Sequence, residues 1–297
     1  MATRRRSVVP LHNLEINFKG PIQFAPNATI EIIPDELRAD SHLKCQAQYD
    51  LERLEATKNC LMFHYEADAL YSKDPNSKSE EPRTIEQANV EAAYLANVAF
   101  WLQHPSPLNF SLIFHLLEFD KFIIQGSERR NRFLSHPNDK DERVKSEDLE
   151  PTKELFAALM KIPRETSVWT AIRSLTAALQ MNIEEIRYLL LWTALEALFG
   201  TSVEIRFRIS QRLAFFIGKD KAGVRTVFAD AKKAYDFRSK VAHGAWKKNT
   251  DSTALTVTSE AFLRRALMRV VMDDSVTQYF FGKDEHRELF LDEQVFI

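Results

Sequence analysis

The C-terminal half of the chain carries hydrophobic positions at the spacing of α-helices. Apolar side chains recur there at three- and four-residue steps over segments 166–180, 183–199, 203–217, 223–243 and 259–281. This spacing places them on one face of a helix. The segment 183–199 is apolar nearly all round, which is typical of a central, buried helix. We therefore expect a bundle of four to five helices in this half.

The N-terminal half has a different pattern. Between residues 14 and 32 apolar positions alternate in short bursts separated by Gly20-Pro21 and Pro26-Asn27, which predicts short strands joined by turns. Residues 61–65 indicate a further strand, and residues 85–102 keep helical spacing. The apolar segment 109–119 fits either a strand or a short buried helix.

These patterns predict an α+β N-terminal domain followed by an all-α bundle. We place the mixed α+β domain at residues 1–150, a connector helix at 151–164 and the helical domain at 165–297. A chain of 297 residues is long enough for two domains that each bury a core.

Composition excludes several classes of protein. No GxGxxG or GxxxxGK[ST] loop occurs, and the histidines show no HExxH spacing, so we expect no nucleotide cofactor and no metal site. The two cysteines, Cys45 and Cys60, form no CxxC motif, which favours a reducing compartment. The longest apolar run, 188–199, is too short to span a bilayer and contains Glu196, so we expect a cytoplasmic protein without a membrane partner.

The net charge of −2 is unevenly distributed. Residues 200–270 hold 15 Lys and Arg against 6 Asp and Glu, a local charge of 15 − 6 = +9. Such a local positive field attracts polyanions even when the whole protein is mildly acidic. Solvated helix faces are the simpler explanation for most of these charges taken singly.

Arg238 interrupts the apolar stripe of the segment 223–243. The stripe consists of Val224, Phe228, Ala231, Tyr235 and Ala242, with Arg238 in the slot between the last two. An inward guanidinium is costly unless it is paired or used. His243, five residues on, is the residue type best suited to proton transfer near neutral pH, and Gly244 is a natural helix stop. These residues are the leading candidates for chemistry.

Glu196 lies within an apolar helix and needs a cation. The candidate partners are Arg208, Arg212 and Arg238. The pair could fix the helix register, orient a catalytic arginine, or do both. The candidates for binding a phosphate-bearing substrate are Arg208, Arg212 and Lys240. The two arginines are one turn apart and share a helix face. The alternative is that one of the two arginines pairs with Glu196 and the other is solvated.

Three blocks, 191–199, 205–214 and 235–244, resemble the HEPN domain, specifically its Apea-like branch. The resemblance covers about residues 165–282 and implies a helical bundle that dimerises. In catalytically active HEPN proteins two Arg-x4-6-His motifs meet across the dimer interface and form a metal-independent endoribonuclease. Arg238 and His243 match that motif, and Ser239 stands where active members often carry Asn, Asp or His. Many such proteins act as toxins or in defence against invading nucleic acids.

The resemblance implies a homodimer that cleaves single-stranded RNA through attack of the 2′-OH, without a cofactor. His243 would transfer protons and Arg238 would bind the phosphate. Ser239, Glu196 and Tyr235 would support them. The alternative is a non-catalytic HEPN module for binding or assembly. A third hypothesis makes the N-terminal domain a sensor for an unidentified ligand or activator.

Overall fold

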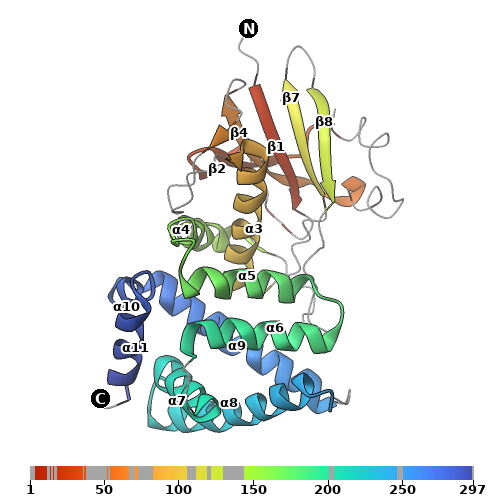
Figure 1. Ribbon diagram of the computed structural model, residues 1–297. Helices are drawn as coiled ribbons and strands as arrows, with labels where there is room; N and C mark the ends of the chain where they lie inside the picture. The colour runs from red at the N-terminus through yellow and green to blue at the C-terminus, as the bar shows by residue number, and fades with distance from the viewer. Residues whose placement is uncertain are drawn as a thin grey trace. The chain divides into compact units, whose positions relative to one another are not determined.

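The computed structural model describes residues 4–11, 14, 16, 19–35, 37, 52, 54–66, 71–72, 83–105, 112–118, 122–129, 144–200, 204–245 and 250–295. The chain divides into two compact units, residues 1–160 and 161–297 (Figure 1). The first unit contains a small antiparallel sheet with helices, and the second is helix-rich, as the hydrophobic pattern predicts.

The main sheet of the N-terminal unit has six strands in the order β2-β3-β4-β1-β7-β8, with every neighbouring pair antiparallel. The strands are β1 (Arg4–Leu11), β2 (Ile22–Ala25), β3 (Ala28–Ile32), β4 (Asn59–Glu66), β7 (Leu112–Glu118) and β8 (Phe122–Arg129). A separate pair joins β5 (Tyr71–Ser72) to β6 (Arg83–Thr84).

The strands predicted over residues 22–32 and 61–65 are confirmed, and the ambiguous segment 109–119 contains strand β7. Strand β1 was not predicted, yet it lies in the middle of the sheet between β4 and β7. Its run of arginines hides the strand pattern, although Val8 and Val9 are fully buried. The alternation at residues 14–18 lies largely outside the described residues.

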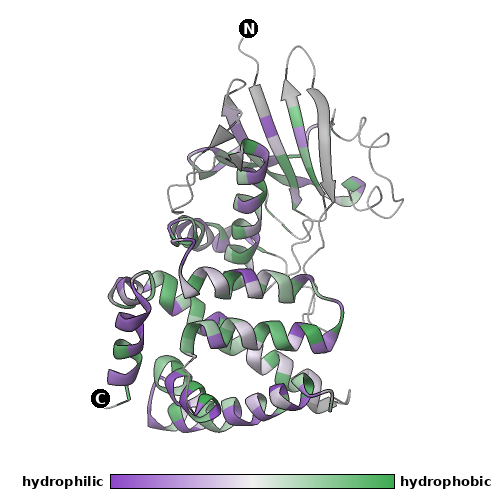
Figure 2. Cartoon of the chain, in the orientation of Figure 1, coloured by the Kyte–Doolittle hydropathy of each residue, from purple (hydrophilic) through white to green (hydrophobic). Residues whose placement is uncertain are grey.

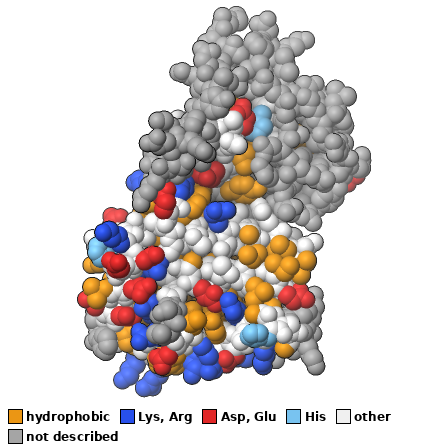
Figure 3. All heavy atoms as spheres, viewed as in Figure 1, with side chains coloured by type: hydrophobic (Ala, Val, Ile, Leu, Met, Phe, Trp, Pro, Cys, Tyr) orange, Lys and Arg blue, Asp and Glu red, His pale blue; other side chains and the backbone are white. Residues whose placement is uncertain are grey.

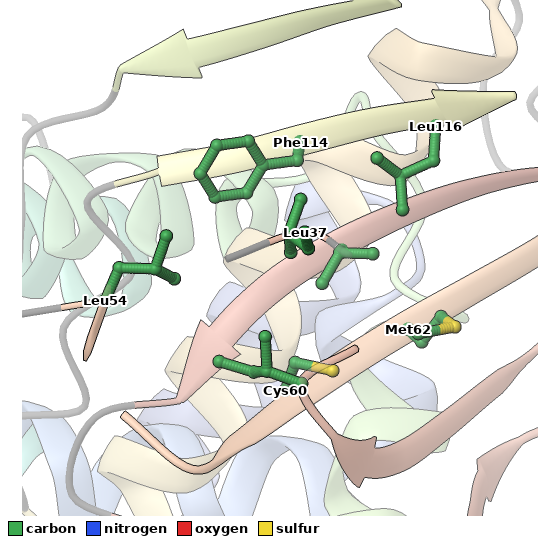
Figure 4. Close-up of a cluster of buried hydrophobic side chains, with 8 residues drawn as sticks. Leu37, Leu54, Cys60, Met62, Phe114 and Leu116 are labelled. Atoms are coloured by element: carbon green, nitrogen blue, oxygen red, sulfur yellow. The ribbon is translucent and has the colours of Figure 1, made fainter. Parts of the chain in front are cut away.

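Both faces of the sheet are covered. On one face, apolar side chains of β1, β4 and β7 form a cluster with the segment around Leu37 and Leu54 (Figure 4). On the other, helix α3 (Ile85–Gln103) contributes Asn89, whose amide donates to the buried hydroxyl of Ser7 at 3.0 Å. That hydroxyl also lies 2.9 Å from Nδ1 of His115 on β7. A buried polar chain therefore ties the helix to two strands.

Helix α4 (Leu149–Leu159) follows the short 3-10 turn η1 (Ser146–Asp148). It overlaps the predicted connector helix, residues 151–164, and lies in the N-terminal unit. The ring of Phe156 lies 5.1 Å from that of Phe24 on β2, which in turn stacks on Phe100 of α3 at 5.7 Å. Aromatic packing thus joins α4 to the N-terminal unit.

The described part of the C-terminal unit contains seven helices rather than four to five. They are α5 (Ser167–Gln180), α6 (Glu184–Phe199), α7 (Ile205–Ile217), α8 (Lys221–Ala242), α9 (Thr250–Met272), α10 (Asp274–Phe280) and α11 (Asp284–Glu293). The single helix predicted over 259–281 is wrong. Asp273 accepts a hydrogen bond from the Ser275 backbone N–H at 3.1 Å, so its carboxylate caps a new helix there.

Helix α6 is the centre of the C-terminal unit and contacts α5, α7, α8 and α9. Figure 2 shows α6 as mostly hydrophobic, whereas α8 carries many hydrophilic residues. Tyr188 and Trp192, one turn apart on α6, are almost completely buried. The Tyr188 hydroxyl donates to the backbone carbonyl of Ala234 on α8 at 2.7 Å, and its ring meets Phe237 edge-on at 5.0 Å. Tyr188 therefore joins α6 to α8.

The buried hydroxyl of Tyr188 predicts an alkaline limb of stability. Burial raises the pKa of Tyr188 from near 10 to about 12. Its contribution to the free energy of unfolding is therefore complete below pH 10 and lost as the pH rises from 10 to 12. We expect Tyr188→Phe to lower the free energy of unfolding by about 1 kcal/mol at pH 7. Above pH 10 the stability of the variant should fall less steeply than that of the wild type.

Urea unfolding followed by tryptophan fluorescence between pH 7 and 12 measures both effects. Tyr279→Phe is the matched control, because Tyr279 is only partly buried and stacks on Phe290 at 4.5 Å. Equal slopes for wild type and Tyr188→Phe above pH 10 would contradict the prediction.

Candidate functional site

An ion pair joins Glu196 of α6 to Arg238 of α8. Nη2 of Arg238 lies 3.1 Å from Oε1 and 3.2 Å from Oε2 of Glu196. The side chains are 28% and 26% exposed, so the pair lies at the edge of the helix contact. Of the three arginines that the sequence offers as partners for Glu196, the structure selects Arg238. Nε of Arg238 is buried without a hydrogen-bond partner, so the guanidinium retains unused donor capacity.

Tyr235 and Trp192 flank this ion pair. The guanidinium carbon of Arg238 lies 5.7 Å from the centroid of the Tyr235 ring, and that ring meets Trp192 edge-on at 5.2 Å. Burial raises the pKa of Tyr235, and the negative charge of Glu196 raises it further. Tyr235 therefore stays protonated near neutral pH, and its ring lies within range of a cation–π contact with Arg238.

His243 is the C-terminal cap of α8 and is exposed. The chain ends the helix with two characteristic hydrogen bonds: Gly244 N–H donates to the Val241 carbonyl at 3.0 Å, and Ala245 N–H donates to the Lys240 carbonyl at 2.8 Å. Gly244 has φ of +72°, a conformation that favours glycine. The predicted helix stop is confirmed, and it fixes the backbone of His243 at the helix end.

Arg238 and His243 point in different directions within one chain. Five residues of α-helix correspond to about 140° of rotation about the axis, and Arg238 faces α6 while His243 faces solvent. Within the described part of the chain, no contact joins their side chains, and the Ser239 hydroxyl makes no hydrogen bond to the imidazole. Ser239 meets His243 only through its backbone carbonyl, which accepts the His243 N–H at 3.1 Å. The roles assigned to these three side chains remain predictions.

Arg212 occupies a structural position, which differs from its predicted place on a substrate surface. It is 2% exposed, and its guanidinium donates to the carbonyls of Phe199 and Gly200 at 3.3 and 3.0 Å. Nη2 also lies 2.9 Å from Oδ1 of Asp292 on α11. These contacts satisfy carbonyls that the end of α6 leaves without helical partners. Arg212 is therefore not available to a ligand in solvent, and it does not pair with Glu196.

Arg208, one turn before Arg212, is more accessible. Its side chain is 38% exposed and lies 3.9 Å from Glu204 and from Asp292. Both distances are long for ion pairs, so Arg208 retains the capacity to bind an anion. Lys240, the third predicted substrate-binding residue, is exposed on the last turn of α8.

A second buried arginine contacts the end of α6, and the sequence pattern did not predict it. Arg287 of α11 is 7% exposed and donates to the Ala197 carbonyl at 3.2 Å and to Asp284 at 2.9 Å. Burial lowers the pKa of Arg287, although the nearby carboxylates oppose that shift. Its helix carries no pattern that links it to α6.

No cluster of His, Cys, Asp and Glu side chains suited to a metal ion occurs among the described residues. Within the same part of the chain, no helix is long and apolar enough to cross a membrane. Cys60 is buried, and Cys45 lies outside the described residues.

Comparison of the chain with models of protein families, with curated proteins and with solved structures finds no match. The resemblance of residues 165–282 to HEPN domains therefore rests on the three sequence blocks.

The two neighbouring arginines of α7 allow a paired test of this geometry. We expect Arg212→Met to lower the free energy of unfolding by about 2 kcal/mol, because carbonyls at the end of α6 lose a charged donor. Arg208→Met should change it by no more than about 0.5 kcal/mol. Urea unfolding followed by circular dichroism measures both, and equal losses would show that Arg212 does not hold the end of α6.

The two ends of α8 predict opposite effects of a glycine-to-alanine substitution on the free energy of unfolding. Gly244→Ala should cost about 1 kcal/mol, because alanine resists the left-handed conformation. Gly223→Ala, in the first turn of the same helix, should stabilise by about 0.5 kcal/mol, since the added Cβ meets only the Asp220 carboxylate at 3.4 Å. Thermal unfolding of both variants checks the assignment, and a stabilising Gly244→Ala would refute the helix end described here.

Proposed function

We propose that the C-terminal unit is a HEPN-type, metal-independent endoribonuclease that acts on single-stranded RNA as a homodimer. The observation that carries the proposal is the end of α8, where Arg238 is held by Glu196 and His243 is exposed five residues later. The basic charge around this helix supports a polyanionic substrate. A role as a toxin or in defence against invading nucleic acid follows from the resemblance to HEPN proteins.

The proposed reaction uses the nucleophile that RNA carries. One His243 imidazole accepts the proton of the 2′-OH, whose oxygen attacks the adjacent phosphorus. The bond between phosphorus and the 5′-oxygen breaks, and the imidazolium of the second His243 gives its proton to that oxygen. The products are a 2′,3′-cyclic phosphate and a free 5′-OH. DNA lacks the 2′-OH and is not cleaved by this route.

Arg238 binds the phosphate in this proposal. Its contacts with Glu196 use Nη2 and its Nε is buried, so Nη1 is the group that donates to phosphate oxygens in this proposal. Preorganised donors are most effective where charge develops in the transition state. Glu196 and Tyr235 then act as positioning residues that hold the guanidinium, and Ser239 is placed one turn from His243 to orient the imidazole.

Two copies of the chain are needed because one chain supplies one imidazole. A symmetric dimer brings the same helix end from each protomer to a common axis, as an isologous interface requires. Arg238 and His243 point in different directions within one chain, so in this proposal the complete site is formed by side chains of both protomers.

The second candidate function is a non-catalytic HEPN module for binding or assembly. The observation that favours it is the pairing of Arg238 with Glu196 and with the Tyr235 ring, which stabilises the contact between α6 and α8 without any substrate. In that case the ion pair holds the bundle, and the N-terminal unit, with its unidentified ligand or activator, determines the biological role.

Cleavage of labelled single-stranded RNA in EDTA tests the proposal. We expect His243→Ala to reduce the cleavage rate at least about 100-fold. The melting temperature should change little, because the imidazole is exposed. His286→Ala is the matched control, since His286 is an exposed histidine on α11. Equal cleavage by wild type and His243→Ala would refute the proposed mechanism.

Arg238→Ala separates the two candidate functions. The endoribonuclease proposal expects a loss of cleavage much larger than the loss of stability, since a quarter-exposed ion pair contributes modestly to folding. The assembly proposal expects a lower melting temperature or a weaker dimer, and an RNase-free preparation that never cleaves RNA. Sedimentation analysis and calorimetry on the same samples supply the comparison.

A further inference from the structure

A groove of about 720 Å³ is lined by residues of α7, α8 and the first part of α9. We call it the α8 groove, and its charged lining consists of Arg206, Lys232, Lys233, Asp236 and Lys240. Of the four charged lining residues that α8 contributes, Lys232, Asp236 and Lys240 follow at steps of four, so they share one face of the helix, and Lys233 lies beside them. The volume of the groove is typical of ligand-binding sites. The motif of Arg238 and His243 does not account for it.

The groove carries an excess of positive charge. Asp236 is the one carboxylate among the described lining residues, and it is already engaged, because Nη2 of Arg206 lies 2.5 Å from its Oδ2. Among the described residues, Lys232, Lys233 and Lys240 have no carboxylate partner within ion-pair distance. Figure 3 shows Lys and Arg side chains gathered along the lower edge of this face, where Figure 1 places α7 and α8. Three unneutralised cations in a concave surface concentrate a positive potential.

Two aromatic rings in the groove are occupied by protein contacts. Phe228 meets Phe207 edge-on at 5.6 Å, and the ammonium of Lys232 lies 5.2 Å from its centroid. Phe237 meets Tyr188 edge-on at 5.0 Å. These rings are poorly placed to stack on successive bases, so the chemistry of the groove favours phosphates over bases.

The groove leads to the end of α8. Asp236, Lys240 and His243 follow one another at steps of four and three residues, so they lie in one row on the helix surface. Lys233 and Lys240 are seven residues apart, about 10 Å along the helix axis. That length accommodates more than one phosphate of a nucleic-acid strand.

We propose that the α8 groove binds the phosphate backbone of single-stranded nucleic acid, without preference for sequence, and leads the strand to His243. The second part rests on the proposed endoribonuclease function. The first part does not, because the lysines bind DNA and RNA phosphates alike, whereas cleavage requires the 2′-OH.

Binding of a fluorescein-labelled, 20-nucleotide single-stranded DNA, measured by fluorescence anisotropy with the full chain, tests the groove. The DNA has no 2′-OH, so the measurement is independent of cleavage. We expect the double variant Lys233→Gln/Lys240→Gln to bind at least about five-fold more weakly at low salt. The slope of log K against log salt should decrease by about 1.4, the value expected for two lost phosphate contacts on a single strand.

Lys219→Gln/Lys221→Gln is the matched control. It removes the same charge from exposed positions at the other end of α8, outside the groove. Equal weakening by the two double variants would overturn the proposal, because the effect would then follow net charge alone. If inorganic phosphate raises the melting temperature of the protein but the oligonucleotide does not bind, the proposal is overturned as well.

The same samples separate this inference from the proposed function. DNA binding that depends on Lys233 and Lys240, in a protein that does not cleave RNA, supports the groove and counts against the endoribonuclease. RNA cleavage that is unaffected by Lys233→Gln/Lys240→Gln supports the endoribonuclease and counts against the groove.

Discussion

Polar side chains that α6 carries into its contacts with neighbouring helices need partners there, and this constraint organises the C-terminal unit. Arg187 of α6 meets Glu260 of α9, with Nε 3.0 Å from Oε1, while Glu196 meets Arg238 of α8. The carbonyls at the end of α6 take donors from Arg212. Removing one partner from such contacts leaves a desolvated group uncompensated. The polar contacts of α6 therefore select which arginines become structural.

That selection has a functional consequence. Arg212 is buried and donates to carbonyls at the end of α6. Arg238 is about a quarter exposed, and its Nε makes no hydrogen bond. Helix α8 then serves three purposes with three parts of its surface. Its apolar face packs on α6, its C-terminal end presents His243, and its outer face carries the basic groove. Stability, proposed chemistry and proposed substrate binding thus all depend on one helix, and Arg238 contributes to the first two.

The hydrophobic pattern predicted the helices from 167 to 242 well, because helical spacing is a local property. It failed where the decision is not local. Strand β1 is central through its pairing with β4 and β7, which no spacing within residues 4–11 reveals. The break at Asp273 depends on a side chain that caps α10. The packing of Phe156 on Phe24 likewise assigns α4 to the first unit.

The sequence by itself determined that Glu196, on an apolar helix, needs a cation, that the helix of Arg238 stops before Gly244, and that basic charge collects around this helix. Those conclusions follow from residue type and spacing. Only the tertiary structure decided that Arg238 is the partner and that Arg212 holds a helix end, because the choice among cations depends on which helices meet. The exposure of the His243 imidazole is likewise a product of packing, since its spacing from Arg238 sets only the angle between the two side chains.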